Sequence, residues 1–324
     1  MTDPPATPEP QEIIEIRFTV EPAYRGWRLD HYLQIRLGRL SRTRIADIIR
    51  RILTLNGNAV RKPGVRVKPG DQILIRRPAP VERDVPRNFE ELARGPGYLA
   101  VYKPAGLPVH PSAHYWHNTL TALVRERYGE DSGLNMAHRL DRETSGIVLF
   151  GTDPASTRQL KMAFRDGLVK KRYLALVHGD LAQSCEVDAP IGPASDSVIR
   201  LRMGVRSDGQ PSHTELIPRE RFGDHTLVEA HPHTGRQHQI RVHLEHLGHP
   251  VVGDKLYGHP DRFFLTIVAH GGMPPELKST LMLERHALHA AHIRFPVPDG
   301  SGAEAQVHAP LPPDMESLIT RLRR

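Results

Sequence analysis

The sequence predicts an α+β protein of two domains joined by a linker. Its 324 residues are enough for a full-sized core and an accessory domain. Segments with apolar residues at helical spacing are mixed with short alternating segments that are typical of strands. The segment from Pro78 to Pro96 contains four prolines and separates the two parts. We place the linker at residues 81–97, a small domain at residues 25–80 and a larger domain at residues 98–324.

Residues 1–24 are predicted to form an N-terminal extension. Residues 1–11 are rich in proline and poor in apolar residues, so we expect them to be disordered. Residues 13–20 alternate enough to form a strand. No basic segment followed by an apolar segment opens the sequence, so we expect no secretory signal.

Two helices and a small β-unit are expected in the small domain. Leucines recur every four residues and predict a helix over residues 28–37. Ser41 suits the N-cap of a second helix over residues 42–51, whose apolar face consists of isoleucines. Asn56-Gly57 is a strong hairpin signal, and a further strand is expected at residues 72–76.

Positive charge is concentrated in the small domain. Residues 25–80 contain 14 Lys and Arg against three Asp, a net charge of +11, whereas the whole chain carries +7 and its remainder therefore −4. Such an imbalance is typical of a surface that contacts a phosphate backbone. A solvated basic face without a partner is the alternative.

Strands and helices are also mixed in the larger domain. The predicted strands are residues 98–102, 147–150 and 173–177. One helix is expected at residues 156–164. In another, Ile240, Leu244 and Leu247 share one face, and Gly248 ends it.

One loop of the larger domain has the composition of a catalytic loop. Residues 138–146 read His-Arg-Leu-Asp-Arg-Glu-Thr-Ser-Gly, and a buried apolar strand follows directly. Asp141 is therefore expected on a polar loop that a rigid strand holds in place, which is a common location for catalytic groups. The alternative is an ordinary surface ion pair between Asp141 and a neighbouring arginine, which contributes little.

Several motifs resemble one family of enzymes. Residues 138–146 resemble the signature around the catalytic aspartate of the RluA-type pseudouridine synthases. Residues 103–111, Lys-Pro-Ala-Gly-Leu-Pro-Val-His-Pro, resemble the loop that opens that family's catalytic domain. Lys171-x-Tyr173 and residues 234–244, Thr-Gly-Arg-Gln-His-Gln-Ile-Arg-Val-His-Leu, match two further motifs of the family.

The resemblance covers most of the chain. From Tyr98 to the C-terminus it is interrupted only by residues 259–283, which we expect to be an inserted, partly helical segment. Residues 25–77 resemble an S4 RNA-binding domain, with an Arg-rich helix followed by a hairpin entered through Leu-x-Leu-Asn-Gly. For the larger domain the resemblance implies a central, mostly antiparallel mixed sheet flanked by helices.

The resemblance also implies roles for particular residues. Asp141 is expected to be the catalytic carboxylate, Tyr173 to face the target base, and Arg241 to pair with Asp141. Asp254 matches a residue that the family places in a structural turn. We expect basic residues of both domains to bind RNA: Arg42, Arg44, Arg50, Arg51, Lys103, His110, Arg139 and Lys171.

The residues suit the chemistry of uridine isomerisation, which breaks a C–N bond, turns the base and rejoins it through carbon. No redox step or external group is involved, so we expect no cofactor, and the sequence contains no nucleotide-binding glycine motif. An aspartate is a competent nucleophile or stabiliser of positive charge at the anomeric carbon. Whether Asp141 attacks the sugar, attacks the base or removes a sugar proton is left open.

Composition restricts the class of protein further. The 20 histidines do not fall into a ligand motif with cysteines, so we expect no metal site. Cys185 is the single cysteine, which excludes an internal disulfide and fits a reducing cytoplasm. No apolar run approaches the ~20 residues that span a bilayer. We expect a cytoplasmic monomer that binds RNA and no membrane.

The predicted function is an RNA pseudouridine synthase that acts on large-subunit (23S) ribosomal RNA. Transfer RNA is the alternative substrate. An inert RNA-binding or ribosome-assembly factor is a second alternative, against which the intact set of Asp141, Tyr173 and Arg241 argues. A hydrolase with paired carboxylates would need a second acid, for which Glu143 is the only local candidate.

Overall fold

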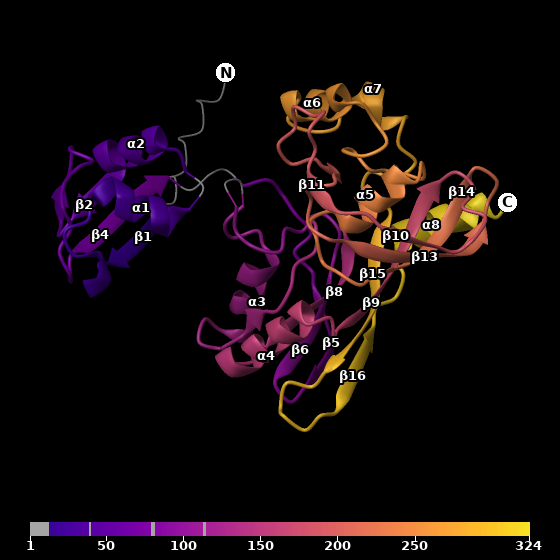
Figure 1. Ribbon diagram of the computed structural model, residues 1–324, viewed down its shortest axis with the longest axis horizontal. Coiled ribbons are helices and arrows are strands. Elements are labelled where there is room, and N and C mark those ends of the chain that lie inside the picture. The colour runs from indigo at the N-terminus through magenta and orange to yellow at the C-terminus, as the bar shows by residue number, and fades with distance from the viewer. Residues whose placement is uncertain (1–12, 39, 79–81, 113–114) are drawn as a thin grey trace, which may run out of the picture. The chain divides into compact units, whose positions relative to one another are not determined.

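The structure, a computed structural model, describes residues 13–38, 40–78, 82–112 and 115–324. The chain falls into two compact units, residues 1–81 and 82–324 (Figure 1). The predicted disorder of residues 1–11 lies outside the described residues. Within the described ranges, no helix combines the length and apolar character needed to cross a membrane.

The small unit is a four-stranded antiparallel sheet covered by two helices. Its core consists of apolar side chains from both helices and the sheet, including Leu33, Ile49 and Ile75. The strand order is β1-β4-β2-β3. The elements are α1 (Leu29–Leu37), α2 (Arg42–Ile52), β1 (Ile13–Thr19), β2 (Leu53–Leu55), β3 (Asn58–Ala59) and β4 (Gln72–Pro78).

Local signals in this unit are confirmed. The Ser41 hydroxyl accepts a hydrogen bond from the Arg44 N–H, which caps α2 as predicted. Asn56 and Gly57 both have positive φ, at 51° and 81°, as a two-residue hairpin turn requires. The predicted extension over residues 1–24 is wrong in extent, because all of β1 pairs with β4 and Ile14 is buried. The strand therefore belongs to the small unit.

The larger unit is built on a ten-stranded sheet in the order β10-β13-β14-β9-β15-β8-β6-β5, with β16 paired to β15 and β7 to β8. Every pairing is antiparallel except that of β15 with β8. This confirms the mostly antiparallel mixed sheet. The strands are β5 (Glu90–Gly95), β6 (Tyr98–Lys103), β7 (Asn135–Met136), β8 (Ser145–Gly151), β9 (Lys170–His178), β10 (Cys185–Asp188), β13 (His213–Arg221), β14 (His225–Pro232), β15 (Leu288–Pro296) and β16 (Glu304–His308).

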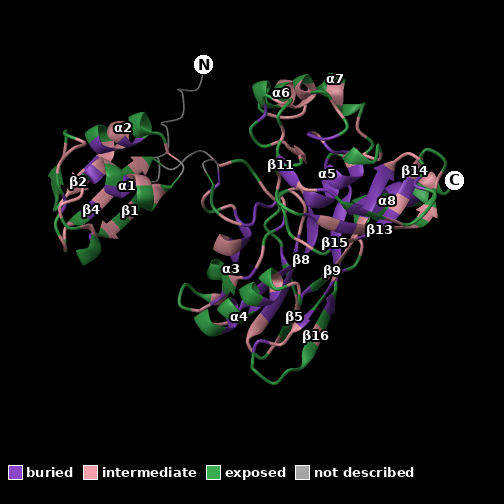
Figure 2. Cartoon of the chain, in the orientation of Figure 1, coloured by how far each residue is buried: buried purple, intermediate pink, exposed green. Residues whose placement is uncertain are grey.

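Helices and one short hairpin surround this sheet. The predicted inserted segment at residues 259–283 is partly helical, as expected, and its two helices, α6 and α7, contain no buried residue (Figure 2). The remaining elements are α3 (Leu120–Tyr128), α4 (Pro154–Arg165), α5 (Gln239–His246), α6 (Asp261–Ala269), α7 (Pro275–Lys278), α8 (Pro313–Leu322), β11 (Ile191–Pro193) and β12 (Met203–Val205).

The predicted linker at residues 81–97 is too long. Residues 90–95 form β5, the edge strand beside β6, and Phe89 is buried before it. Glu90, Glu91 and Arg94 are the kind of charged residue that blunts an exposed sheet edge. Of the prolines that marked the linker, Pro78 is the last residue of β4, and Pro86 and Pro96 lie outside β5, where no ladder hydrogen bond is lost.

Close packing fixes β8, the strand that follows the loop of Asp141. All seven residues of β8 are buried. Gly146 has a φ of 115°, and a Cβ there would lie 2.2 Å from the carbonyl oxygen of Ala290. Glycine is therefore required where β8 pairs in parallel with β15, and this contact holds the preceding loop in place.

Candidate active site

A cavity of about 590 Å³ opens beside the loop that contains Asp141. Its walls come from the loop before β8, the end of α4, β9, the loop after β14 and the start of α5. Among the residues that line it are Arg139, Asp141, Lys171, Tyr173, His238 and Arg241. In the described part of the chain, no three His, Cys, Asp or Glu side chains are grouped so as to hold a metal ion.

The loop that presents Asp141 is anchored at both sides of that residue. Leu149 of β8 donates its N–H to Nε2 of His138 over 3.1 Å. The side chain of Leu140 is buried, and the Thr144 N–H donates to the carbonyl of Asp141 over 3.1 Å. Asp141 is thereby held above the core with its carboxylate turned toward the cavity.

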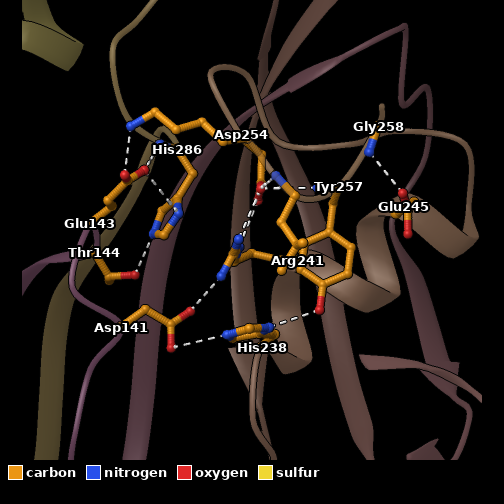
Figure 3. Close-up of polar contacts among 12 residues, drawn as sticks. Asp141, Glu143, Thr144, His238, Arg241, Glu245, Asp254, Tyr257, Gly258 and His286 are labelled. Carbon is orange, nitrogen blue, oxygen red and sulfur yellow. Dashed lines mark hydrogen bonds and ion pairs between the residues drawn. The ribbon is translucent and has the colours of Figure 1, made fainter. Parts of the chain in front are cut away.

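Arg241 joins Asp141 to the buried carboxylate of Asp254 (Figure 3). Its Nη1 donates to Oδ2 of Asp141 over 2.9 Å, so the predicted ion pair is present. Its Nε and Nη2 donate to Asp254 over 2.6 and 2.9 Å. Asp254 also accepts the N–H groups of Leu256 and Tyr257. Asp254 is therefore a structural acceptor in a turn, as expected, with no oxygen directed at the cavity.

Neighbouring polar side chains govern the protonation of Asp141. Burial by itself raises the pKa of this carboxyl, but His238, Arg241 and Arg139 outweigh that effect and bring the pKa below its ordinary value. Burial by itself lowers the pKa of Arg241, but the carboxylates of Asp254 and Asp141 outweigh that effect. The pKa of Arg241 is therefore raised above its ordinary value. Both groups are ionised at neutral pH.

Tyr173 extends from β9 into the same cavity. Its ring packs between two hydrophobic clusters of the core. Burial, and to a smaller degree the charge of Asp141, raises the pKa of the phenol, which stays neutral at physiological pH. Its hydroxyl forms no hydrogen bond with any of the residues that the structure describes, so it is available to a ligand.

His238 was missed by the sequence interpretation. Its side chain is 7% exposed, its Nδ1 lies 2.8 Å from the Tyr257 hydroxyl, and its Nε2 lies 3.9 Å from Oδ1 of Asp141. Burial lowers the pKa of His238 to about 4, so the ring is neutral. His238 lies inside the motif at residues 234–244. The motif does not reveal that the backbone of His238 has a positive φ, which turns the ring toward Asp141.

Glu143 does not form a carboxylate pair with Asp141. Its Oε1 accepts hydrogen bonds from Lys255 over 2.6 Å and from Arg142 over 3.3 Å. It lines a different cavity from the one at Asp141. The hydrolase alternative therefore loses its second acid.

Lys103 was predicted to bind RNA, and this is wrong. The side chain is completely buried, and its ammonium donates to three carbonyl oxygens, those of Pro104, Leu107 and Arg142, over 2.9–3.0 Å. Burial lowers the pKa of this lysine to about 7. Lys103 ties the loop after β6 to the loop of Asp141 and has no surface to offer to RNA.

The other basic residues remain candidates for RNA contact. Arg139 is exposed at the cavity, and Lys171 lines it while donating to the Thr234 carbonyl over 2.9 Å. Burial lowers the pKa of Lys171 to about 8. His110 is partly buried beside Met136. In the small unit all four arginines of α2 are exposed: Arg42, Arg44, Arg50 and Arg51.

Known proteins are similar to this chain in sequence and in fold. Residues 97–246 match the family model of RNA pseudouridylate synthases. The ribosomal large subunit pseudouridine synthase D of Zymomonas mobilis is 36% identical over 316 residues, which are 92% of this chain and 94% of that protein. The corresponding synthase C of Vibrio cholerae is 33% identical over 92% of this chain and 94% of its own length.

Two solved human structures are similar to this chain in fold. RNA pseudouridylate synthase domain containing 1 superposes with a TM-score of 0.55 at 27% identity and covers 75% of this chain and 98% of its own. Domain containing 4 has a TM-score of 0.56 at 25% identity, with 72% and 93% covered. The chain therefore belongs to the RNA pseudouridine synthases, isomerases that convert uridine to pseudouridine in RNA, and among them to the group that includes the large-subunit synthases C and D.

Proposed function

We propose that the protein isomerises uridines of large-subunit (23S) ribosomal RNA in the cytoplasm, with Asp141 as its catalytic carboxylate. The names of its relatives in Zymomonas mobilis and Vibrio cholerae support this substrate. The observation that carries the catalytic assignment is the ion pair of Asp141 and Arg241 at a cavity that Tyr173 also lines.

The surroundings of Asp141, Arg241 and Tyr173 suit each of them to a particular role. The ionised Asp141 can attack an electron-poor carbon or stabilise positive charge at the anomeric carbon. Arg241 keeps the carboxylate charged and directs one of its oxygens. Tyr173 stacks on the extruded base, which contributes about 1–3 kcal/mol against an unstacking cost of a few kcal/mol.

We propose that RNA is held by both units. The two-helix, four-stranded arrangement of the small unit and its exposed arginines on α2 support its assignment as an S4-type domain. Arg139, His110 and Lys171 would contact the nucleotides near the cavity. Such contacts to phosphates position an RNA without reading its sequence.

The test is to map pseudouridines in ribosomal RNA from cells with and without the gene. We expect one or a few large-subunit positions to lose pseudouridine, and the purified protein to restore them in unmodified RNA. Loss confined to transfer RNA, with ribosomal RNA unchanged, would contradict the proposed substrate.

A further inference from the structure

His238 has an unusual backbone conformation for its position. Among the described residues, only Asn56 and His238 are non-glycine residues with positive φ. Asn56 forms a hairpin turn that requires this geometry. His238 precedes α5 with φ 57° and ψ 17°, yet its side chain caps no N–H of that helix. A residue with a Cβ adopts this conformation at a cost, and residues held in this way by their surroundings cluster at active sites.

The conformation places the imidazole between Asp141 and Tyr257 (Figure 3). Nδ1 is within hydrogen-bond distance of the Tyr257 hydroxyl, at 2.8 Å. Nε2 faces Oδ1 of Asp141 at 3.9 Å, whereas Arg241 holds the other oxygen, Oδ2. The two oxygens of the carboxylate thus face different partners.

Tyr257 determines which ring nitrogen carries the proton. Its hydroxyl oxygen accepts the N–H of Met203 over 3.0 Å. For the hydroxyl's own proton, His238 Nδ1 is the acceptor found among the described residues. A neutral imidazole has one proton, and with Nδ1 accepting, that proton is on Nε2. An N–H therefore points toward Asp141.

Tyr257 is itself rigidly held. The ring is buried, and the guanidinium carbons of Arg241 and Arg202 lie 4.8 and 5.4 Å from its centroid. Its backbone N–H donates to Asp254 over 3.1 Å. These contacts form a closed ring of interactions in which each side chain limits the movement of the next. Its members are Asp141, Arg241, Asp254, Tyr257 and His238.

We propose that His238 is a positioning residue that orients the second oxygen of Asp141 through its Nε2–H, with Tyr257 fixing the tautomer. The proposal rests on the catalytic role of Asp141. The separation of 3.9 Å exceeds a hydrogen bond, and such contacts often tighten only when a substrate is bound. A neutral donor suits this task, because it orients the carboxylate without adding a further full positive charge to those of Arg241 and Arg139, which would weaken its reactivity.

Other groups also act on Asp141. The charged and titratable residues that face it are Arg139 from its own loop, Tyr173 from β9, Lys103 at the end of β6, and His238, Arg241 and Tyr257. A test must therefore compare variants at His238 in the same background, so that these groups stay constant.

Two substitutions separate orientation from packing. His238→Asn tolerates a positive φ and retains an acceptor for Tyr257, but it is too short to donate toward Asp141. His238→Gln has the length to place an N–H near the position of Nε2. His243→Asn is the matched control, because His243 is a buried histidine of α5 that bonds Thr214 and the Ala189 carbonyl instead.

The measurement is the single-turnover rate on a large-subunit RNA fragment as a function of pH, with RNA affinity and thermal stability recorded beside it. We expect His238→Asn to lower the rate by roughly 10- to 100-fold, the loss that is typical when a group that orients a metal ligand is removed. Its RNA affinity should be unchanged.

The acid limb of the pH profile of His238→Asn should move to higher pH, because Asp141 loses a group that favours its charged form. His238→Gln should recover part of both effects, and His243→Asn should lower stability without moving the limb.

Three outcomes would overturn the inference: a rate and profile of His238→Asn equal to wild type, a loss that His238→Gln does not reduce at all, or an acid limb that stays in place. If His238→Asn does not fold, Tyr257→Phe replaces it, and an unchanged rate in that variant is equally decisive. Wild-type enzyme and Asp141→Asn are run in the same assay. A wild type without activity counts against the proposed substrate, whereas an active Asp141→Asn counts against the proposed catalytic residue.

Discussion

Arg241 and Asp254 form a buried bidentate ion pair, with Nε–Oδ2 and Nη2–Oδ1 distances of 2.6 and 2.9 Å. Breaking such a pair leaves an uncompensated charge in the core. Asp254→Ala should therefore destabilise the protein by about 3–5 kcal/mol in urea unfolding and reduce turnover, because Arg241 then loses its support. The control is Asp208→Ala, which breaks an exposed ion pair with Arg206 and should leave unfolding nearly unchanged. A fully stable Asp254→Ala protein would show that Asp141 alone suffices to hold Arg241.

Asp141→Asn removes the charge and the nucleophile while keeping the size of the side chain. We expect no pseudouridine from this variant, with folding and RNA affinity retained. Single-turnover assays with mass spectrometry of the product RNA provide the measurement, and the same method on the protein excludes deamidation back to aspartate. Appreciable turnover by the Asp141→Asn protein, once deamidation is excluded, is incompatible with the catalytic assignment.

Tyr173→Phe keeps the ring for stacking and loses only the hydroxyl. RNA binding should persist while the chemical step slows, since the neutral phenol is free to exchange a proton with the base. Tyr173→Ala is the comparison, and it should weaken binding as well by removing the stacking surface, worth about 1–3 kcal/mol per base. A wild-type rate in Tyr173→Phe would restrict this residue to stacking.

Lys103 should make stability depend on pH. Burial lowers its folded-state pKa to about 7, below the ordinary value of about 10.4. At pH values between these two pKa values, the unfolded chain holds a proton on this lysine that the folded chain does not. The free energy of unfolding therefore rises with pH over this range. Lys103→Met should remove that rise when unfolding free energies at pH 7 and pH 10 are compared with wild type. At pH 7 it should also be less stable, by about 1–3 kcal/mol for each carbonyl left without a donor. Equal pH dependence in the two proteins would contradict the depressed pKa.

The small unit should supply much of the electrostatic affinity for RNA. Each phosphate contact contributes about −0.7 to −0.9 to the slope of log affinity against log salt, so a protein lacking residues 1–81 should have a visibly flatter slope. Exchanging Arg42, Arg44, Arg50 or Arg51 singly for Gln should remove at most about one unit. The truncated protein should still modify RNA at high enzyme concentration. Identical slopes for full-length and truncated protein would mean that the charge of this unit serves solubility only.

Features that depend on neighbouring residues were predictable from the sequence. The Ser41 cap and the Asn56-Gly57 turn follow from local chemistry, and the motifs brought Asp141, Tyr173 and Arg241 to one cavity. The edge strand β5 was missed because Glu-Glu-Leu-Ala-Arg-Gly has no clean alternation and prolines precede and follow it. The burial of Lys103 was missed because its ammonium donates to three backbone carbonyls. Every residue has a backbone carbonyl, so the sequence does not indicate which ones accept from a lysine.

The ion pair between Asp141 and Arg241 joins residues 100 positions apart. Leu140 beside the first and Ile240 beside the second belong to different hydrophobic clusters. Contacts of such long sequence separation carry a large entropic cost of loop closure, which packing of both clusters must offset. A chain in which either cluster is unpacked therefore carries no aligned carboxylate with which to alter an RNA.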